Sequence, residues 1–145
     1  MSVGRICVRV VHYAKPGESV REAACRMATA DVGTLVVVDP PSVPAGILTD
    51  RDVMRSLAAG LDPDRTRLES VMGKPVVTID EAAPIEEGLS RMASHEVRRL
   101  VVTDARGRLV GILSMDDVLE LLAEELTTVG KLVGRRKRRT LVLGR

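Results

Sequence analysis

Residues 46–52 read Gly-Ile-Leu-Thr-Asp-Arg-Asp, and residues 111–117 read Gly-Ile-Leu-Ser-Met-Asp-Asp. The two stretches lie 65 positions apart, and the same offset superposes much of the chain without a gap. It places Arg26-Met27-Ala28 on Arg91-Met92-Ala93 and Leu35-Val36-Val37 on Leu100-Val101-Val102. Because self-similarity at a fixed period indicates a repeat architecture, we expect one structural unit to occur twice.

Within each unit, short β-branched runs alternate with amphipathic segments, which predicts the element order β-α-β-β-α. The expected strands are residues 6–11, 35–38 and 45–48 in the first unit and 75–79, 100–103 and 109–113 in the second. The expected helices are residues 19–30, 50–59, 84–95 and 115–125. Two helix starts have clear signals, since Ser19-x-x-Glu22 is a capping box and Pro84 suits the beginning of a helix.

Neither half, at about 60 residues, could bury its sheet and both helices well alone. We therefore expect an α+β fold in which two β-α-β-β-α repeats pack sheet to sheet around a pseudo-twofold axis. The expected organisation is a first repeat over residues 6–60, a linker over 61–74, a second repeat over 75–125 and a basic C-terminal tail over 126–145.

The composition argues against several classes of protein. Tyr13 is the only aromatic residue, so a platform for stacking single-stranded nucleic acid is missing. Cys7 and Cys25 lack metal spacing, and we expect no signal peptide, no membrane span and a cytoplasmic location. His12 and His95 have no ligand companions at metal spacing, and no nucleophile stands beside a base. We expect no metal, no cofactor and no enzymatic activity.

The two corner motifs are the candidate binding sites. Each joins a strand to a helix, so a hydroxyl (Thr49 or Ser114) and backbone N–H groups at the helix start could hold a phosphate. A carboxylate three residues on (Asp52 or Asp117) could accept hydrogen bonds from a ribose diol. The alternative is that both motifs are capping boxes without a ligand.

The repeat, the Leu-Val-Val strand and the Gly-Ile-Leu-(Thr/Ser)-x-x-Asp motif resemble a tandem pair of CBS domains over residues 6–125. The resemblance implies a regulatory homodimer that binds AMP, ADP or ATP, with S-adenosylmethionine as a further candidate, between the repeats. It implies that Asp52 and Asp117 hold ribose hydroxyls and that Thr49 and Ser114 meet the phosphate or ribose. It also implies that backbone groups of Val76 and Val77 serve the cleft of Asp52 and those of Val11 and His12 the cleft of Asp117. Val32 and Val97 would line the base pockets.

The two clefts should differ. Arg98 and Arg99 lie where CBS domains have basic residues that bind phosphate, whereas the first unit has Gly33 and Thr34 at the equivalent positions. A phosphorylated ligand should prefer the cleft that these arginines reach. The alternative is that the arginine pair, beside Glu96, is only a solvated edge.

The C-terminal tail is strongly basic, with no acidic residue after Glu125. Mutual repulsion in its basic run should oppose compact packing. The run could bind nucleic acid phosphates or a protein partner, or it could serve as a solubilising or inter-subunit extension. It consists of Arg135, Arg136, Lys137, Arg138 and Arg139.

Overall fold

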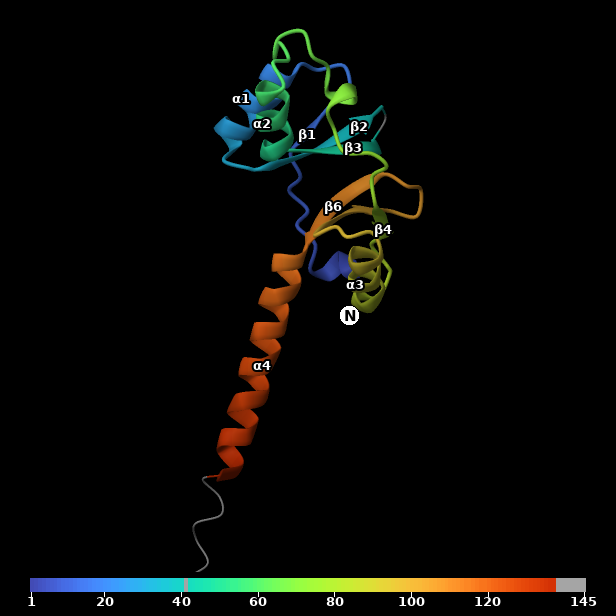
Figure 1. The fold of residues 1–145 in the computed structure, drawn as a ribbon. Coiled ribbons are helices and arrows are strands. Elements are labelled where there is room, and N and C mark those ends of the chain that lie inside the picture. The colour runs from blue at the N-terminus through green and yellow to red at the C-terminus, as the bar shows by residue number, and fades with distance from the viewer. Residues whose placement is uncertain (41, 138–145) are drawn as a thin grey trace, which may run out of the picture.

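The computed structural model describes residues 1–40 and 42–137, with side chains up to residue 134. Two stacked halves form the body, and one long helix projects from it (Figure 1). The first half contains β1 (Tyr13–Ala14), α1 (Val20–Ala30), β2 (Thr34–Asp39), β3 (Val43–Thr49) and α2 (Asp50–Ala58). The second contains β4 (Thr78–Asp80), α3 (Ile85–Ser94), β5 (Arg99–Thr103), β6 (Leu109–Ser114) and α4 (Met115–Lys137). The expected α+β fold with two β-α-β-β-α repeats is confirmed.

Each half has a three-stranded sheet whose first strand runs parallel to the second and whose third runs antiparallel to it. The two sheets face each other, and α1, α2 and α3 lie on their outer sides (Figure 1). A buried apolar layer lies between the sheets because their inner faces are β-branched. Its fully or nearly buried members are Val36, Val38 and Val101, with Val11, Ile47, Val76, Leu109 and Ile112 packed around them.

The prediction for the first strand of the first half was wrong in position, and that for the second half matched the observed strand only at Thr78 and Ile79. The strand expected at residues 6–11 is β1 at Tyr13–Ala14, and the one expected at 75–79 is β4 at Thr78–Asp80. The apolar residues before β1 serve a different purpose, since they cross to the second half. Val3 is fully buried in the second half's core, and its N–H donates to the Ala83 carbonyl at 2.9 Å.

The crossing is reciprocal. A short 3₁₀ helix, Val3–Arg5, packs on the second half, and its equivalent, Leu68–Ser70, lies in the expected linker and buries Leu68 in the first half's core. A Cβ at Gly46 would meet Met72 Sδ at 2.6 Å, and a Cβ at Gly111 would meet Cys7 Sγ at 2.8 Å. The glycine of each corner motif therefore lets the crossing segment approach the sheet closely.

The last helix differs most from the prediction. It was expected to end at residue 125, yet α4 continues to Lys137. Most residues from Glu120 onward are strong helix formers, and their propensity outweighs the repulsion in the basic run. Arg135, Arg136 and Lys137 therefore lie on a helix, whereas Arg138 and Arg139 lie outside the described residues. Within the described part of the chain, no helix is long and apolar enough to cross a membrane.

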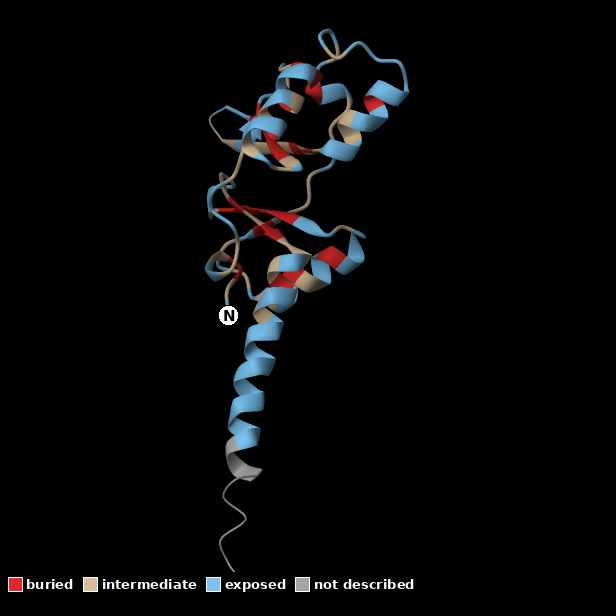
Figure 2. Ribbon diagram, turned by 90° about the vertical axis from the view of Figure 1, so that its left-hand side faces the viewer, coloured by how far each residue is buried: buried red, intermediate tan, exposed pale blue. Residues whose placement is uncertain are grey.

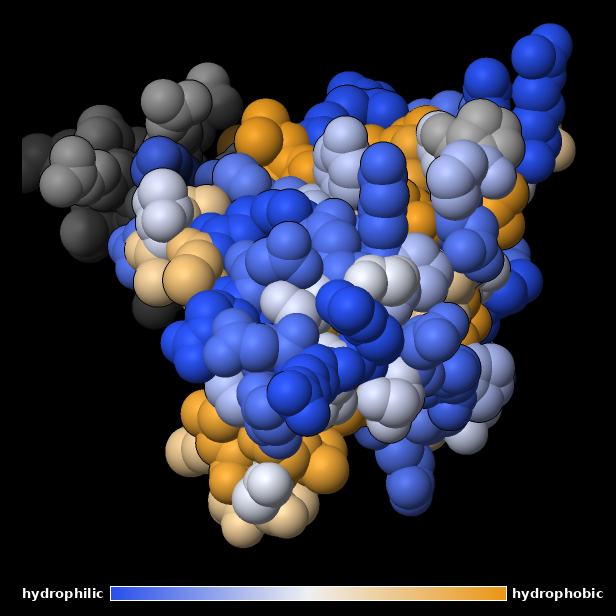
Figure 3. Space-filling model, turned by 90° about the horizontal axis from the view of Figure 1, so that it is seen from above, coloured by the Kyte–Doolittle hydropathy of each residue, from blue (hydrophilic) through white to orange (hydrophobic). Residues whose placement is uncertain are grey.

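The surface of the body is mixed. Seen from the end that carries the first half, it is mainly hydrophilic at its centre, with hydrophobic side chains gathered toward the margins (Figure 3). Buried residues concentrate in the sheets and on the helix faces that cover them (Figure 2).

Candidate functional site

Both corner motifs form capping boxes, as the alternative interpretation predicted. The Asp52 Oδ2 atom accepts hydrogen bonds from Thr49 N and Thr49 Oγ1, both at 2.8 Å, and the hydroxyl accepts from Asp52 N at 3.2 Å. Asp117 Oδ2 repeats this with Ser114 N and Oγ at 2.7 Å. In each carboxylate the other oxygen, Oδ1, has no hydrogen-bond partner among the described residues. Capping and ligand binding are thus compatible at these corners.

The first corner opens into a cavity of about 630 Å³, which we call the Asp52 cleft. This volume lies within the range of roughly 300–1,000 Å³ that small-molecule sites occupy. The cleft lies between the halves, because α2 and β3 supply one wall and the segment before β4, together with the loop from α3 to β5, supplies the other. Its lining includes Thr49, Arg51, Asp52, Arg55, Lys74, Val76, Val77, His95, Glu96, Val97, Arg98 and Arg99.

The second corner opens into a smaller cavity of about 270 Å³, the Asp117 cleft. Its lining includes Val11, His12, Val32, Gly33, Thr34, Arg99, Ser114 and Asp117. All twelve residues expected at the ligand sites therefore line at least one of the two clefts. Val76 and Val77 lie in the cleft of Asp52, and Val11 and His12 lie in the cleft of Asp117, as expected. Their roles in binding stay predictions.

Backbone hydrogen bonds hold the wall segments in equivalent positions. The His12 carbonyl accepts from Val36 N, and the Val77 carbonyl accepts from Val101 N, both at 3.1 Å. These bonds fix the segments before β1 and β4 against the central strand of each sheet. The apolar side chains beside each corner are thus held in place without a ligand.

The two corners also share a cavity of about 420 Å³, bordered by the first turns of both α2 and α4. Arg98 and Arg99 both line it. Arg98 forms an ion pair with Asp116 at 3.5 Å, and their side chains are 75% and 77% exposed. Such an exposed pair contributes little to stability, so a phosphate could replace Asp116 as the partner of Arg98 at little cost.

Charge distinguishes the two clefts. Five cationic side chains line the Asp52 cleft against two carboxylates, whereas Arg99 and Asp117 are the charged residues of the Asp117 cleft. Sequence analysis missed three of the five cations, Arg51, Arg55 and Lys74. Arg51 and Arg55 stand on either side of Asp52 along α2, so their spacing on one helix was the available signal.

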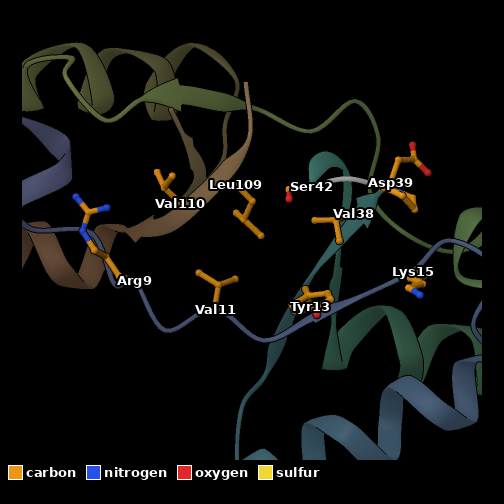
Figure 4. A pocket seen from close by; sticks show the side chains of 10 residues that line it. Arg9, Val11, Tyr13, Lys15, Val38, Asp39, Ser42, Leu109 and Val110 are labelled. Carbon is orange, nitrogen blue, oxygen red and sulfur yellow. The ribbon is translucent and has the colours of Figure 1, made fainter. Parts of the chain in front are cut away.

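A further cavity of about 430 Å³ lies at the hairpin ends of the strands, away from the corners (Figure 4). Arg9, Val11, Tyr13 and Lys15, from the segment that leads into β1, from β1 itself and from just after it, form one side of the cavity (Figure 4). It has no corner hydroxyl and no helix start, so it lacks the features that favour a ribose phosphate at the clefts.

The histidines lie apart from each other. His12 lines the Asp117 cleft, and His95 lines the Asp52 cleft with its Nδ1 atom 3.0 Å from the Arg91 carbonyl oxygen. Among the residues described, no three His, Cys, Asp or Glu side chains gather at metal-binding distance.

A family model for the CBS domain matches the chain twice, over residues 3–59 and 68–124. An uncharacterised protein of Methanopyrus kandleri is 34% identical over 122 residues, which are 83% of this chain and 62% of that relative. This chain thus spans less than two thirds of the relative's length.

Three solved structures share the fold. Hypoxic Response Protein I of Mycobacterium tuberculosis, with two coordinated zinc ions, has a TM-score of 0.73 at 33% identity, covering 83% of this chain and 98% of that one. A CBS domain protein from Pyrobaculum aerophilum complexed with AMP has a TM-score of 0.74 at 26% identity, covering 85% and 99%. A CBS domain pair in complex with 5′-methylthioadenosine and S-adenosyl-L-methionine has a TM-score of 0.74 at 25% identity, covering 84% and 99%. With two matched copies that together span most of its length, this chain belongs to the CBS domain family.

Proposed function

We propose that this chain is a ligand-sensing regulatory module that binds an adenine nucleotide of the AMP, ADP or ATP class, with the phosphates in the Asp52 cleft. The observation that carries the proposal is the combination of a hydroxyl-carboxylate corner, an apolar wall and five cations in one cavity of about 630 Å³. The relative with AMP bound and the relative with S-adenosyl-L-methionine bound support an adenosyl ligand.

Each part of the cleft suits one part of a nucleotide. Asp52 Oδ1 is available to accept a ribose hydroxyl, because the cap uses Oδ2. Val76, Val77 and Val97 offer the apolar surface on which the base would lie. Arg98 and Arg99 would pair with the phosphates, since charge-assisted hydrogen bonds to an anion are the stronger class.

The proposed output is a change in arrangement rather than turnover. A ligand held between two halves shifts their relative position only if it binds one arrangement more tightly than another. We propose that the module is not an enzyme, that it acts as a homodimer and that it works in the cytoplasm, where its two free cysteines would stay reduced.

Calorimetry with AMP, ADP, ATP and S-adenosylmethionine tests the proposal. We expect at least one of these to bind the wild type, and we expect Asp52→Asn to weaken binding of a phosphorylated ligand far more than Asp117→Asn. Asparagine is chosen because it keeps an oxygen that can accept the capping hydrogen bonds. If none of the four compounds binds the wild type, the proposal fails.

Nucleic acid binding through the basic run is a second candidate, favoured by the position of its described members, Arg135, Arg136 and Lys137, at the far end of α4, away from the body (Figure 1). Phosphate contacts of this kind weaken steeply with salt and ignore base sequence. Gel shift with a random duplex, on the full chain and on a variant with Arg135, Arg136 and Lys137 replaced by Ala, would test it. A flat salt response would rule this candidate out.

A further inference from the structure

The helix α4 carries a stripe of apolar side chains that its own chain does not cover. Each member is at least 49% exposed, and Leu126, near the middle of the helix, is 71% exposed. Every residue from Leu122 to Gly134 is exposed, and the helix projects alone from the body (Figures 1 and 2). We call this stripe the α4 seam; it consists of Leu119, Leu122, Leu126, Val129 and Val133. Leu132 is also exposed, but it lies next to the seam and outside its spacing.

The spacing of the α4 seam is that of a coiled coil. Successive members are three, four, three and four positions apart, which is the alternation of the two core positions of a heptad. Met115 continues the pattern toward the body. A surface helix that packed on its own domain would carry a wider stripe, so the narrow seam indicates another helix as the partner.

The charges of α4 indicate the direction of that partner helix. The first half of α4 carries five acidic residues and no basic one, while the described end carries Lys131, Arg135, Arg136 and Lys137. The helix dipole favours this polarity only within the first and last turns, so it does not account for Glu120, Glu124 or Glu125. None of these three glutamates has a basic residue three or four positions away on the helix. Opposite charges meet only if a second α4 runs antiparallel.

We propose that α4 pairs with α4 of a second copy of this chain as an antiparallel two-stranded coiled coil, centred near Leu126. Asp116 of each helix then lies opposite Arg136 of the other, and Glu120 lies beside Lys131, whereas Glu124 and Glu125 lie opposite Thr128 and Thr127. At about 1.5 Å per residue the helix is about 34 Å long, so the two bodies lie at opposite ends of a short rod. Packing of the seam supplies the stability that a single projecting helix lacks in water. The pairing does not depend on the proposed nucleotide.

Sedimentation equilibrium of the full chain tests the pairing. We expect a dimer for the wild type, a monomer for Leu126→Glu and a dimer for Thr127→Glu, which adds the same charge one position outside the seam. Leu126 contributes nothing to the core of the body, so the variant should keep its fold, and circular dichroism checks this. We also expect raised salt to weaken the wild-type dimer, because its ends are held by opposite charges. Leu126→Glu should retain the nucleotide affinity of the wild type, which separates a failure of the pairing from a failure of the ligand proposal.

Distances between spin labels test whether the two α4 helices run antiparallel. In a chain without Cys7 and Cys25, labels placed at Leu119→Cys in both copies should lie about 21 Å apart along the axis in the antiparallel pair, whereas labels at Leu126→Cys should lie close together. Three results would overturn the proposal: a wild-type monomer at all concentrations, a dimer that survives Leu126→Glu, or labels at position 119 as close as those at position 126. Binding of a monomeric chain to anionic lipid vesicles through the seam would also overturn it.

Discussion

The Asp52 cleft and the Asp117 cleft descend from the same repeat and share one geometry, yet they differ in charge. Both have a capped strand-to-helix corner and valines contributed by the other half. At equivalent positions, however, Arg51 is matched by Asp116 and Arg55 by Glu120. The backbone architecture of a binding site can thus be duplicated while its ligand preference is set by a few side chains around it.

The two clefts also differ in which arginines line them. Arg98 lines only the Asp52 cleft and the shared cavity, whereas Arg99 reaches both clefts. In the first half their places are taken by Gly33 and Thr34, and the Asp50 carboxylate lies beside Gly33. A phosphate in the Asp117 cleft would therefore meet fewer cations and an added carboxylate nearby.

Removing both arginines should have the largest effect. We expect Arg98→Ala with Arg99→Ala to lower the affinity of the Asp52 cleft for AMP about tenfold to a hundredfold, because hydrogen bonds to charged groups contribute roughly 1.5–3 kcal/mol. Calorimetry measures the change, and Arg106→Ala, which removes an exposed arginine in the turn between β5 and β6, is the control. Unchanged affinity in the double variant would show that the arginines are only a solvated edge.

Adding a cation to the Asp117 cleft should make the two clefts more alike in their affinity for a phosphate. Thr34→Arg places an arginine at the position equivalent to Arg99, and we expect it to raise the affinity of the Asp117 cleft for AMP about fivefold, or about 1 kcal/mol. Thr34→Gln is the matched long, neutral control. If both variants bind AMP equally at this cleft, local charge does not decide the preference.

The capping hydroxyls should have equal effects on stability and unequal effects on binding. Thr49→Ala and Ser114→Ala each remove an N-cap, so each should lower the free energy of unfolding by about 1 kcal/mol in urea denaturation. Only Thr49→Ala should also weaken the binding of AMP. Equal losses of affinity in the two variants would mean that the clefts are equivalent.

The smallest effect concerns the first helix of each half. Hydrogen bonds from the Ser19 N–H and hydroxyl lower the pKa of Glu22 below its ordinary value of 4.5, whereas α3 begins at Pro84 without a side-chain cap. Because the pKa is lowered, ionised Glu22 stabilises the folded state. This contribution to stability is complete above the ordinary pKa and is lost as the pH falls through the lowered pKa. We expect Glu22→Gln to reduce the acid sensitivity of unfolding slightly. An identical pH profile in variant and wild type would argue against the contribution.

Much of the fold could be predicted because the repeat constrains it twice. The helix starts at Ser19 and Pro84 and the strands of both hairpins lie close to their expected positions. The first strands could not be placed, since the apolar residues near Val8 pack on the other half and a local pattern does not reveal a distant partner. The end of α4 lies beyond the predicted end because helix propensity outweighs charge repulsion in this segment.

Site residues could be predicted where they occupy equivalent positions in the two repeats. They could not be predicted where they come together only through the stacking of the two halves. The corner residues and the valines follow from equivalent places in the two copies. Lys74 becomes part of the Asp52 cleft only when the halves are stacked, so no local motif marks it. Arg51 and Arg55 could have been found from their spacing around Asp52 on α2.

The most direct test of the account follows the valine methyl groups by NMR during a titration with AMP. Unequal clefts predict that Val76, Val77 and Val97 shift at lower AMP concentrations than Val11 and Val32. If Val11 and Val32 shifted first, or if no cleft valine shifted at all, the assignment of the nucleotide to the Asp52 cleft would be contradicted.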